Sequence, residues 1–278
     1  MLGTLIPAFS WHHLNQWTIS LVPNVFLLVF AAGYLWAQRR IAWPRARTVC
    51  FLLGLAVTFL AVESVIGVFD HTYFSVHMVQ HLLLIMVAGP LFALGAPLEL
   101  LYQVLHERGR AVLDGRVVTA LLHPLVAFGL YLVFIPIAHL TSFYNLMLLH
   151  EPLHDLEHVA FLVVGYLFFR VAFGREHGVQ LHPGLRLVFV MAAVPVDTFT
   201  GLALVSETKN PFPAYRHLAP SGASRLSILN DIHLGGVIMW IGGDVLMLLA
   251  CIPITVIWVR YETRRTRVLD QELDALGL

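Results

Sequence analysis

Seven long apolar runs divide the chain, and their length constrains its fold more than any other feature. A helix needs about 20 predominantly apolar residues to cross roughly 30 Å of hydrocarbon. The runs cover residues 18–37, 48–69, 76–97, 117–140, 156–173, 185–205 and 233–259. Because only short segments join them, we expect an all-α integral membrane protein in which residues 1–278 form a single domain, a bundle of seven transmembrane helices.

The composition agrees with a chain that lies mostly in lipid. Hydrophobic residues make up 58% of the sequence and charged residues only 12%, whereas a soluble domain carries about 25% charged residues. A soluble enzyme of this size is therefore largely excluded. The 17 Lys and Arg are balanced by 17 Asp and Glu, so the chain lacks the basic surface of a nucleic-acid-binding protein. We expect the lipid bilayer as a partner, and no nucleic acid.

Several kinds of chemistry lack their characteristic residues. Cys50 and Cys251 are the only cysteines, and no CxxC or CxxCH motif occurs, which argues against a disulfide scaffold, a thiolate zinc site or c-type haem attachment. The one lysine, Lys209, lies between two apolar runs, so a retinal Schiff base within a helix is excluded. No Walker, Rossmann or GxSxG pattern occurs, which leaves nucleotide and serine-hydrolase chemistry without support.

Positive charge is distributed unevenly between the two sides of the expected bundle. Fourteen of the 17 Lys and Arg lie on one side, whereas Lys209, Arg216 and Arg225 lie on the other. Cytoplasmic connections retain positive charge, so we expect the N-terminus outside and the C-terminus in the cytoplasm. No Lys or Arg precedes Arg39. A cleaved signal peptide is therefore not indicated, and the first helix is expected to remain in the mature protein.

Histidine is concentrated on the outer side of the expected bundle. Of the 15 histidines, four lie on the inner side and the others on or near the outer side: His12, His13, His71, His77, His81, His139, His150, His154, His158, His217 and His233. Such a concentration of imidazole favours a metal, haem or proton-handling site there. Four of these residues, taken singly, are interpreted as ordinary amphipathic side chains at headgroup depth: His12, His13, His139 and His217.

Two pairs of histidines have the spacing of about one helical turn. His77 and His81 are four residues apart in the third run, and His154 and His158 repeat that spacing near the start of the fifth. Residues four apart lie on one face of a helix, so we expect both pairs to converge as metal ligands at the outer end of the bundle. Neutral imidazole suits copper, zinc, iron or nickel. Two carboxylates are expected on the same face as the second pair: Glu151 and Asp155.

Other acidic residues lie at or within the apolar runs. Asp70 and Asp231 lie at outer helix ends, where each could bind a cation. Asp231 could equally cap the last helix or orient a ligand histidine. Three acidic residues lie well inside apolar runs, where charge is costly and usually paired or functional: Glu63, Asp197 and Asp244.

Several segments of the chain together resemble one family. Residues 77–84, with the sequence HMVQHLLL, and the following GPLFALGAP at 89–97 are similar to the HMxQH region of the CtaG family. Three further segments resemble that family: residues 139–144, 150–158 and 230–240. The resemblance extends from about Asp70 to Asp244, which is most of the chain.

The resemblance implies a seven-helix protein of the bacterial plasma (inner) membrane that is required to assemble haem–copper cytochrome c oxidase. We therefore expect an assembly factor, not an enzyme, that binds copper at the outer face and supports its insertion into an oxidase subunit. The expected metal ligands are His77, His81, His154, His158, Asp231 and Asp70. Two alternatives remain: a haem-binding membrane redox protein with axial histidines, and a seven-helix zinc-dependent membrane hydrolase.

Overall fold

The computed structural model describes residues 16–174, 176–220 and 222–276. Within these ranges all regular secondary structure is helical, which confirms the all-α prediction. His12, His13 and Arg175, which contribute to the predicted distribution of His and Arg, lie outside the described residues. Six segments are long and apolar enough to cross a membrane: Leu21–Gln38, Arg45–Phe69, Phe74–Val104, Glu151–Phe173, Pro183–Val205 and Arg225–Leu276.

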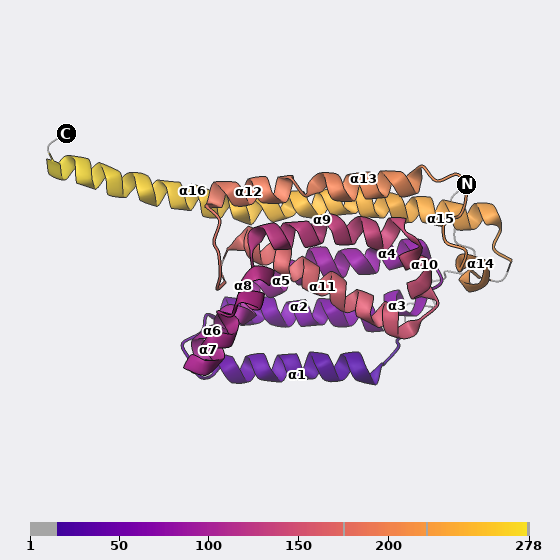
Figure 1. The fold of residues 1–278 in the computed structure, drawn as a ribbon, viewed down its shortest axis with the longest axis horizontal. Helices are drawn as coiled ribbons and strands as arrows, with labels where there is room; N and C mark the ends of the chain where they lie inside the picture. The colour runs from indigo at the N-terminus through magenta and orange to yellow at the C-terminus, as the bar shows by residue number, and fades with distance from the viewer. Residues whose placement is uncertain (1–15, 175, 221, 277–278) are drawn as a thin grey trace.

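Most of these segments consist of several consecutive helices (Figure 1). The first is α1 (Leu21–Gln38), and the second joins α2 (Arg45–Glu63) to α3 (Val65–Phe69). The third comprises α4 (Phe74–Leu82), η3 (Leu83–Ala88), α5 (Gly89–Gly95) and α6 (Pro97–Val104). The others are α11 (Glu151–Phe173), α12 (Pro183–Met191) with α13 (Val194–Val205), and α15 (Arg225–Val237) with η4 (Ile238–Gly242) and α16 (Gly243–Leu276). Three short helices lie between spans: α7 (Glu107–Leu113), α8 (Arg116–Leu121) and α14 (Tyr215–Leu218).

A bent helix pair accounts for the remaining predicted run. Helices α9 (Pro124–Leu140) and α10 (Ser142–Leu148) are long and apolar enough only together, and they meet at an angle of 70°. The bend lies at Thr141, whose hydroxyl accepts a hydrogen bond from the Phe143 amide and so caps α10. The described chain therefore has six candidate spans, or seven if this pair crosses the membrane as one.

The fourth span begins later than residue 117, where its apolar run starts. Helix α8 ends at Leu121, and α9 begins only at Pro124. Proline suits the first position of a helix because it has no amide hydrogen to leave unpaired. His123 precedes it and caps α9, since its Nδ1 accepts a hydrogen bond from the Leu125 amide. Residues 117–121 therefore belong to a separate helix.

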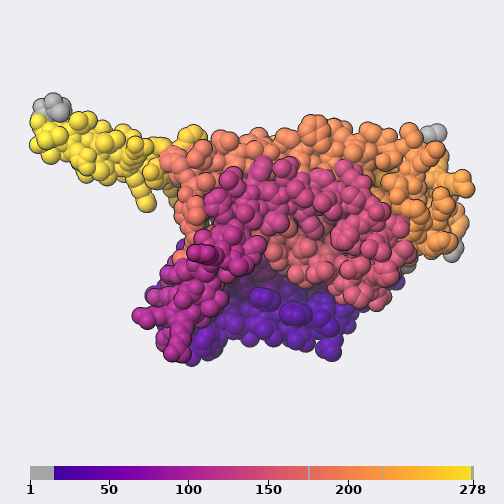
Figure 2. Space-filling view, in the orientation of Figure 1, coloured from indigo at the N-terminus to yellow at the C-terminus, as the bar shows by residue number. Residues whose placement is uncertain are grey.

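The last helical segment is longer than the predicted 233–259 at both ends. It begins at Arg225, where the hydroxyl of Ser224 caps α15 by accepting from the Ser227 amide. It continues to Leu276, and this last portion of α16 stands clear of the bundle (Figures 1 and 2). Hydropathy marks the part of a helix that can lie in lipid. Both extensions contain charged and other polar residues, so they fall outside the apolar run.

Helix α11 runs through the middle of the bundle and packs against α5, η3 and α9. Helix α1 lies at the edge, where it contacts α2 and α6 and leaves most of its surface free (Figure 1). Large apolar side chains cover the outside of the bundle, among them Leu28, Phe199 and Leu248. An apolar exterior is what a chain surrounded by hydrocarbon requires.

Two spans contain a turn of π-helix, η3 in the third span and η4 in the last. A π-turn holds an extra residue, so it changes the face that the following residues present. The two wide turns lie close together, because α4 contacts η4 and α16 contacts η3. Segment η3 starts at Leu83, directly after the helix that carries His77 and His81.

Hydrogen bonds to neighbouring helices account for the three acidic residues that the sequence places well inside the apolar runs. Glu63 accepts from the Ser20 amide at 2.8 Å and from the side-chain amide of Asn24 at 3.0 Å, which ties the start of α1 to the end of α2. Two further pairs join neighbouring helices: Tyr131 Oη donates to Asp197 at 2.6 Å, and Thr198 Oγ1 donates to Asp244 at 3.1 Å.

Candidate metal centre

The two predicted histidine pairs lie close together near the end of the bundle occupied by α3, α10 and α14 (Figure 1). His77 and His81 project from α4, and His154 and His158 project from α11. All four side chains are buried. His154 Nε2 lies 3.5 Å from His77 Nδ1, and the ring centroids within each pair are 4.0 and 4.3 Å apart. The structure therefore brings all four imidazoles to one place.

Glu157 lies between the histidines of α4. Its Oε2 is 3.5 Å from His77 Nε2, and its Oε1 is 3.5 Å from His81 Nε2. These four atoms are buried, and none of them has a hydrogen-bond partner. Buried polar atoms are nearly always paired, because leaving one unpaired costs about 1–3 kcal/mol. Two nitrogens and two carboxylate oxygens therefore face one another without partners, and atoms of these types could hold a cation.

The hydrogen bonds of His139 determine the tautomer of His81, and therefore whether the nitrogen that faces Glu157 carries a proton. His139 Nδ1 donates to the Ile135 carbonyl at 2.8 Å, so its Nε2 is the acceptor in the neutral ring. His81 Nδ1 lies 3.1 Å from that Nε2 and must donate to it. His81 Nε2 is then left unprotonated, next to a carboxylate. Orienting bonds of this kind are typical of histidines that bind metals.

Gln80 connects His158 to Asp70. Its side-chain amide donates to the Ala61 carbonyl at 3.0 Å and to Asp70 Oδ2 at 2.7 Å. Gln80 Oε1 is therefore an acceptor, and His158 Nε2 donates to it at 2.8 Å. The Nε2 of His158 is engaged by this bond, so His158 lies at the site chiefly as part of the network that positions Asp70.

Asp70 lies outside the spans, in the connection between α3 and α4, and its side chain is buried. Its Oδ2 is 3.8 Å from His154 Nε2 and 3.9 Å from His158 Nε2. Burial raises the pKa of Asp70 to about 7, although the hydrogen bond from Gln80 opposes the change. The carboxyl is thus part of the same polar cluster as the histidines.

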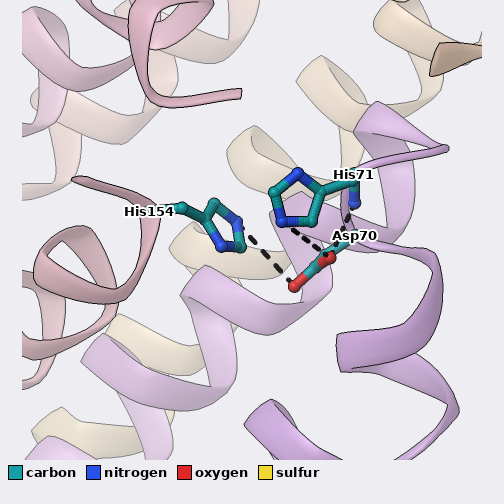
Figure 3. Close-up of side chains that lie close together, drawn as sticks. All are labelled: Asp70, His71 and His154. Atoms are coloured by element: carbon teal, nitrogen blue, oxygen red, sulfur yellow. Dashed lines mark hydrogen bonds and ion pairs between the residues drawn. The ribbon is translucent and has the colours of Figure 1, made fainter. Parts of the chain in front are cut away.

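A second group of possible ligands lies on the outer side of this cluster. It consists of Asp70, His71 and His154, whose ligand atoms all lie within 4.8 Å of one another. Figure 3 shows the rings of His71 and His154 next to the Asp70 carboxylate. The His71 side chain is 33% exposed, whereas that of His154 is 5% exposed. Burial lowers the pKa of His71 below its ordinary value.

Asp231, which belongs to α15, lies apart from these groups and contacts the start of α4. One carboxylate oxygen accepts from the Phe74 amide at 2.6 Å, and the other accepts from the Ser75 hydroxyl. The Phe74 amide is among the first of α4, which have no carbonyl partner within the helix. Asp231 therefore caps α4 from α15, although the sequence suggested it as a cap of the last helix or a ligand.

Three residues of the site were not identified from the sequence: Gln80, His139 and Glu157. The interpretation of His139 as an ordinary side chain at headgroup depth is wrong, because it is buried and bonded to His81. Glu157 follows His154 by three residues, so helical spacing could have placed it on the same face. The predicted companions Glu151 and Asp155 are exposed, but a carboxylate oxygen of Asp155 lies within 4.8 Å of ligand atoms of His154 and His158, as expected for a shared face. Phe161, which is buried and stacks on His81, continues the face formed by His154 and Glu157. The apolar Phe161, on the same face as His154 and Glu157, was the sequence signal that could have identified this face of α11 as the buried one.

Comparison with known proteins places the chain in a family. The family model of the cytochrome c oxidase caa3 assembly factor (CtaG) matches residues 8–261. The chain belongs to this family. The match to CtaG assembly factors includes α4, α11 and α15, which carry the histidine cluster and the cap of α4.

The chain is also similar to mycobacterial proteins. It is 29% identical over 266 residues to uncharacterized proteins of Mycobacterium bovis and Mycobacterium tuberculosis, which covers 90% of this chain. It is 25% identical over 276 residues to an uncharacterized protein of Mycobacterium leprae. The chain spans only 40–42% of the length of these relatives. No solved structure matches it.

Proposed function

We propose that this CtaG-family assembly factor holds copper at the outer face of the membrane and supports its insertion into a subunit of cytochrome c oxidase. The metal-binding residues in this proposal are His77, His81, His154 and Glu157. His139 orients His81, while Gln80 and His158 position Asp70 beside the site. The protein acts here as a carrier of its cargo, without a bond-breaking step.

The observation that carries the proposal is the set of four unpartnered buried atoms on His77, His81 and Glu157. An unprotonated imidazole nitrogen, such as His81 Nε2, and a carboxylate oxygen both present lone pairs, so they repel each other unless a proton or a cation lies between them. A cation bound by Glu157 would give its carboxylate a partner, and the ligand atoms of His77, His154 and Glu157 lie within 4.8 Å of one another. Imidazole and carboxylate donors suit Cu(II), and they also suit zinc.

The surroundings of the histidines favour a single ion over haem. The ring of His81 stacks on Phe161 with centroids 3.7 Å apart, and Tyr144 lies edge-on against His77 at 5.1 Å. Axial ligation of haem requires a flat macrocycle beside the ligating nitrogen. Here the nitrogens of His77 and His81 face a carboxylate at 3.5 Å, which leaves space for an ion alone.

The excess of arginine on one side of the spans supports an outer location. The site lies near the end of the bundle opposite α6, α7 and the C-terminal part of α16 (Figure 1). The arginine-rich connections lie at that opposite end, and such connections stay in the cytoplasm. Copper that arrives from outside the cell membrane would reach the site without crossing the bilayer.

Metal content provides the test. The purified full chain in detergent, stripped of metal and exposed to limiting Cu²⁺, is expected to bind it stoichiometrically, as measured by elemental analysis. The His77→Ala/His81→Ala double variant and Glu157→Gln each remove donors from the site. We expect affinity to fall by about 10–100-fold or more, with a parallel loss of oxidase maturation in cells.

The matched control is His150→Ala, because His150 is an exposed imidazole at the start of α11. It should bind copper and support maturation as the unaltered protein does. Unchanged copper affinity in both site variants, with a normal elution profile on size exclusion, would show that the assigned ligands are wrong. Selective retention of zinc together with hydrolysis of a lipid amide would favour the hydrolase instead.

A further inference from the structure

We propose that Asp70, His71 and His154 form a second, outer copper site, through which the ion reaches the buried site formed by His77, His154 and Glu157. This inference rests on the proposed function and adds a route to it. Within each group, the ligand atoms all lie within 4.8 Å of one another. His154 belongs to both groups.

A single nitrogen connects the two groups. His154 Nε2 lies 3.8 Å from Asp70 Oδ2 on one side and 3.5 Å from His77 Nδ1 on the other. An ion held by this nitrogen can therefore exchange its other ligands one at a time. No step requires the ion to lose all its protein ligands.

Exposure decreases along the same path. The side chain of His71 is 33% exposed, that of His154 is 5% exposed, and that of His77 is fully buried. The rings follow one another closely, with centroids 4.0 Å apart between His71 and His154 and 5.3 Å apart between His154 and His77. His71 is thus the most exposed member of the two groups.

The two sites match in their ligands, which makes exchange between them reversible. Each set of three neighbouring ligands contains two imidazoles and one carboxylate, Asp70 in the outer site and Glu157 in the buried one, where His81 contacts Glu157 as a further imidazole. A Cu²⁺ ion therefore leaves one carboxylate and meets another, and the net charge of its ligand set stays the same. The Cu–O bond to Asp70 and the Cu–N bond to His71 break, a Cu–O bond to Glu157 and a Cu–N bond to His77 form, and no electron is transferred.

The oxygens of Asp70 keep acceptor capacity for an ion. Oδ1 accepts from the His71 amide at 2.6 Å, and Oδ2 accepts from Gln80 at 2.7 Å. Each carboxylate oxygen has two lone-pair sites, so one on each remains. The same hydrogen bonds hold the carboxylate toward His154, and the outer site is thereby formed before an ion binds.

Rapid-mixing measurements of Cu²⁺ uptake test this route. The apo protein and His71→Ala are mixed with Cu²⁺, and uptake is followed by the absorption of the bound ion. We expect His71→Ala to retain the tight site with nearly unchanged affinity, while both uptake and removal by a chelator slow by about tenfold or more. His150→Ala, the exposed neighbour, should take up Cu²⁺ at the rate of the unaltered protein.

Glu157→Gln provides the complementary measurement. It should keep one weaker Cu²⁺ at the outer site, and the double variant His71→Ala/Glu157→Gln should lose that ion. If His71→Ala loads and releases Cu²⁺ at the unaltered rate, the outer site is not on the route, although the buried site stands. If the unaltered protein binds no copper, the proposed function itself fails.

Discussion

Carboxylates near the histidine cluster have different roles, which their partners distinguish. Glu157 has no hydrogen-bond partner on either oxygen and faces two histidines. Both oxygens of Asp231 instead accept hydrogen bonds from residues at the start of α4. A carboxylate that already accepts hydrogen bonds from an amide and a hydroxyl gains less free energy from binding an ion, because those bonds would be weakened or lost. The structure therefore favours Glu157 over Asp231 as a ligand.

Substitution of Asp231 distinguishes a cap from a ligand. Asp231→Asn keeps an acceptor oxygen for the Phe74 amide, so we expect copper stoichiometry to stay unchanged. Asp231→Ala removes the cap and should lower the free energy of unfolding by about 1–2 kcal/mol. Thermal unfolding in detergent and copper titration measure the two effects. A loss of copper in Asp231→Asn as complete as in Glu157→Gln would identify Asp231 as a ligand.

The histidines of the site could be predicted from the sequence because their spacing is a property of one helix. His77 with His81, and His154 with His158, each occupy one helical face whatever the rest of the chain does. The partners of these histidines depend on how separate helices pack. His139 comes from α9 and Gln80 binds a carboxyl from the connection before its own helix, and no local spacing relates these positions.

Close packing between α11 and the third span sets the position of the face of α11 that carries His154 and Glu157. A methyl group at Gly165 would lie 2.5 Å from the Ile85 carbonyl oxygen, and one at Gly89 would lie 2.8 Å from the Gly165 carbonyl carbon. Small residues permit such close approach of helices in membranes. The two glycines thus allow α11 to lie directly against η3 and α5.

Gly165→Ala is expected to force α11 away from η3, because the obstructing atom belongs to the backbone. Overpacking of this kind costs about 1–3 kcal/mol, and the shift should also weaken copper binding at the other end of α11. Thermal unfolding and copper titration provide the measurements.

Gly129→Ala is the matched control, since a methyl group on that helical glycine meets nothing within 4 Å. It should be as stable as the unaltered protein or slightly more stable. Equal stability and copper affinity in Gly165→Ala and Gly129→Ala would contradict the role assigned to this contact.

Helix positions could be predicted from hydropathy, but their ends and irregularities could not. The runs at 48–69 and 185–205 agree closely with Arg45–Phe69 and Pro183–Val205. The bend at Thr141 and the wide turns η3 and η4 leave no clear trace in an apolar pattern. They depend on local capping and on contacts between spans.

Orientation in the membrane is a property of the whole molecule, and cysteine labelling can test it. With Cys50 and Cys251 replaced by Ala, we compare His217→Cys, in the α14 region, with Thr266→Cys, in the projecting part of α16. Both positions are exposed. The distribution of arginine predicts that a membrane-impermeant maleimide labels His217→Cys in intact cells, and labels Thr266→Cys only after permeabilisation. The reverse pattern would place the histidine cluster on the cytoplasmic side.

The length of the last helical segment links distant parts of the molecule. Its 52 residues form a rod of about 78 Å at 1.5 Å per residue, more than twice the roughly 30 Å of hydrocarbon. Asp231 lies near one end of this rod and caps the helix of His77 and His81, while the other end extends beyond the bundle (Figure 2). The projecting end and the cap of α4 thus belong to one helical segment, interrupted by the π-turn η4 and by Pro253. Through this segment a tilt of the projecting end would act on the first turn of the helix that carries His77 and His81.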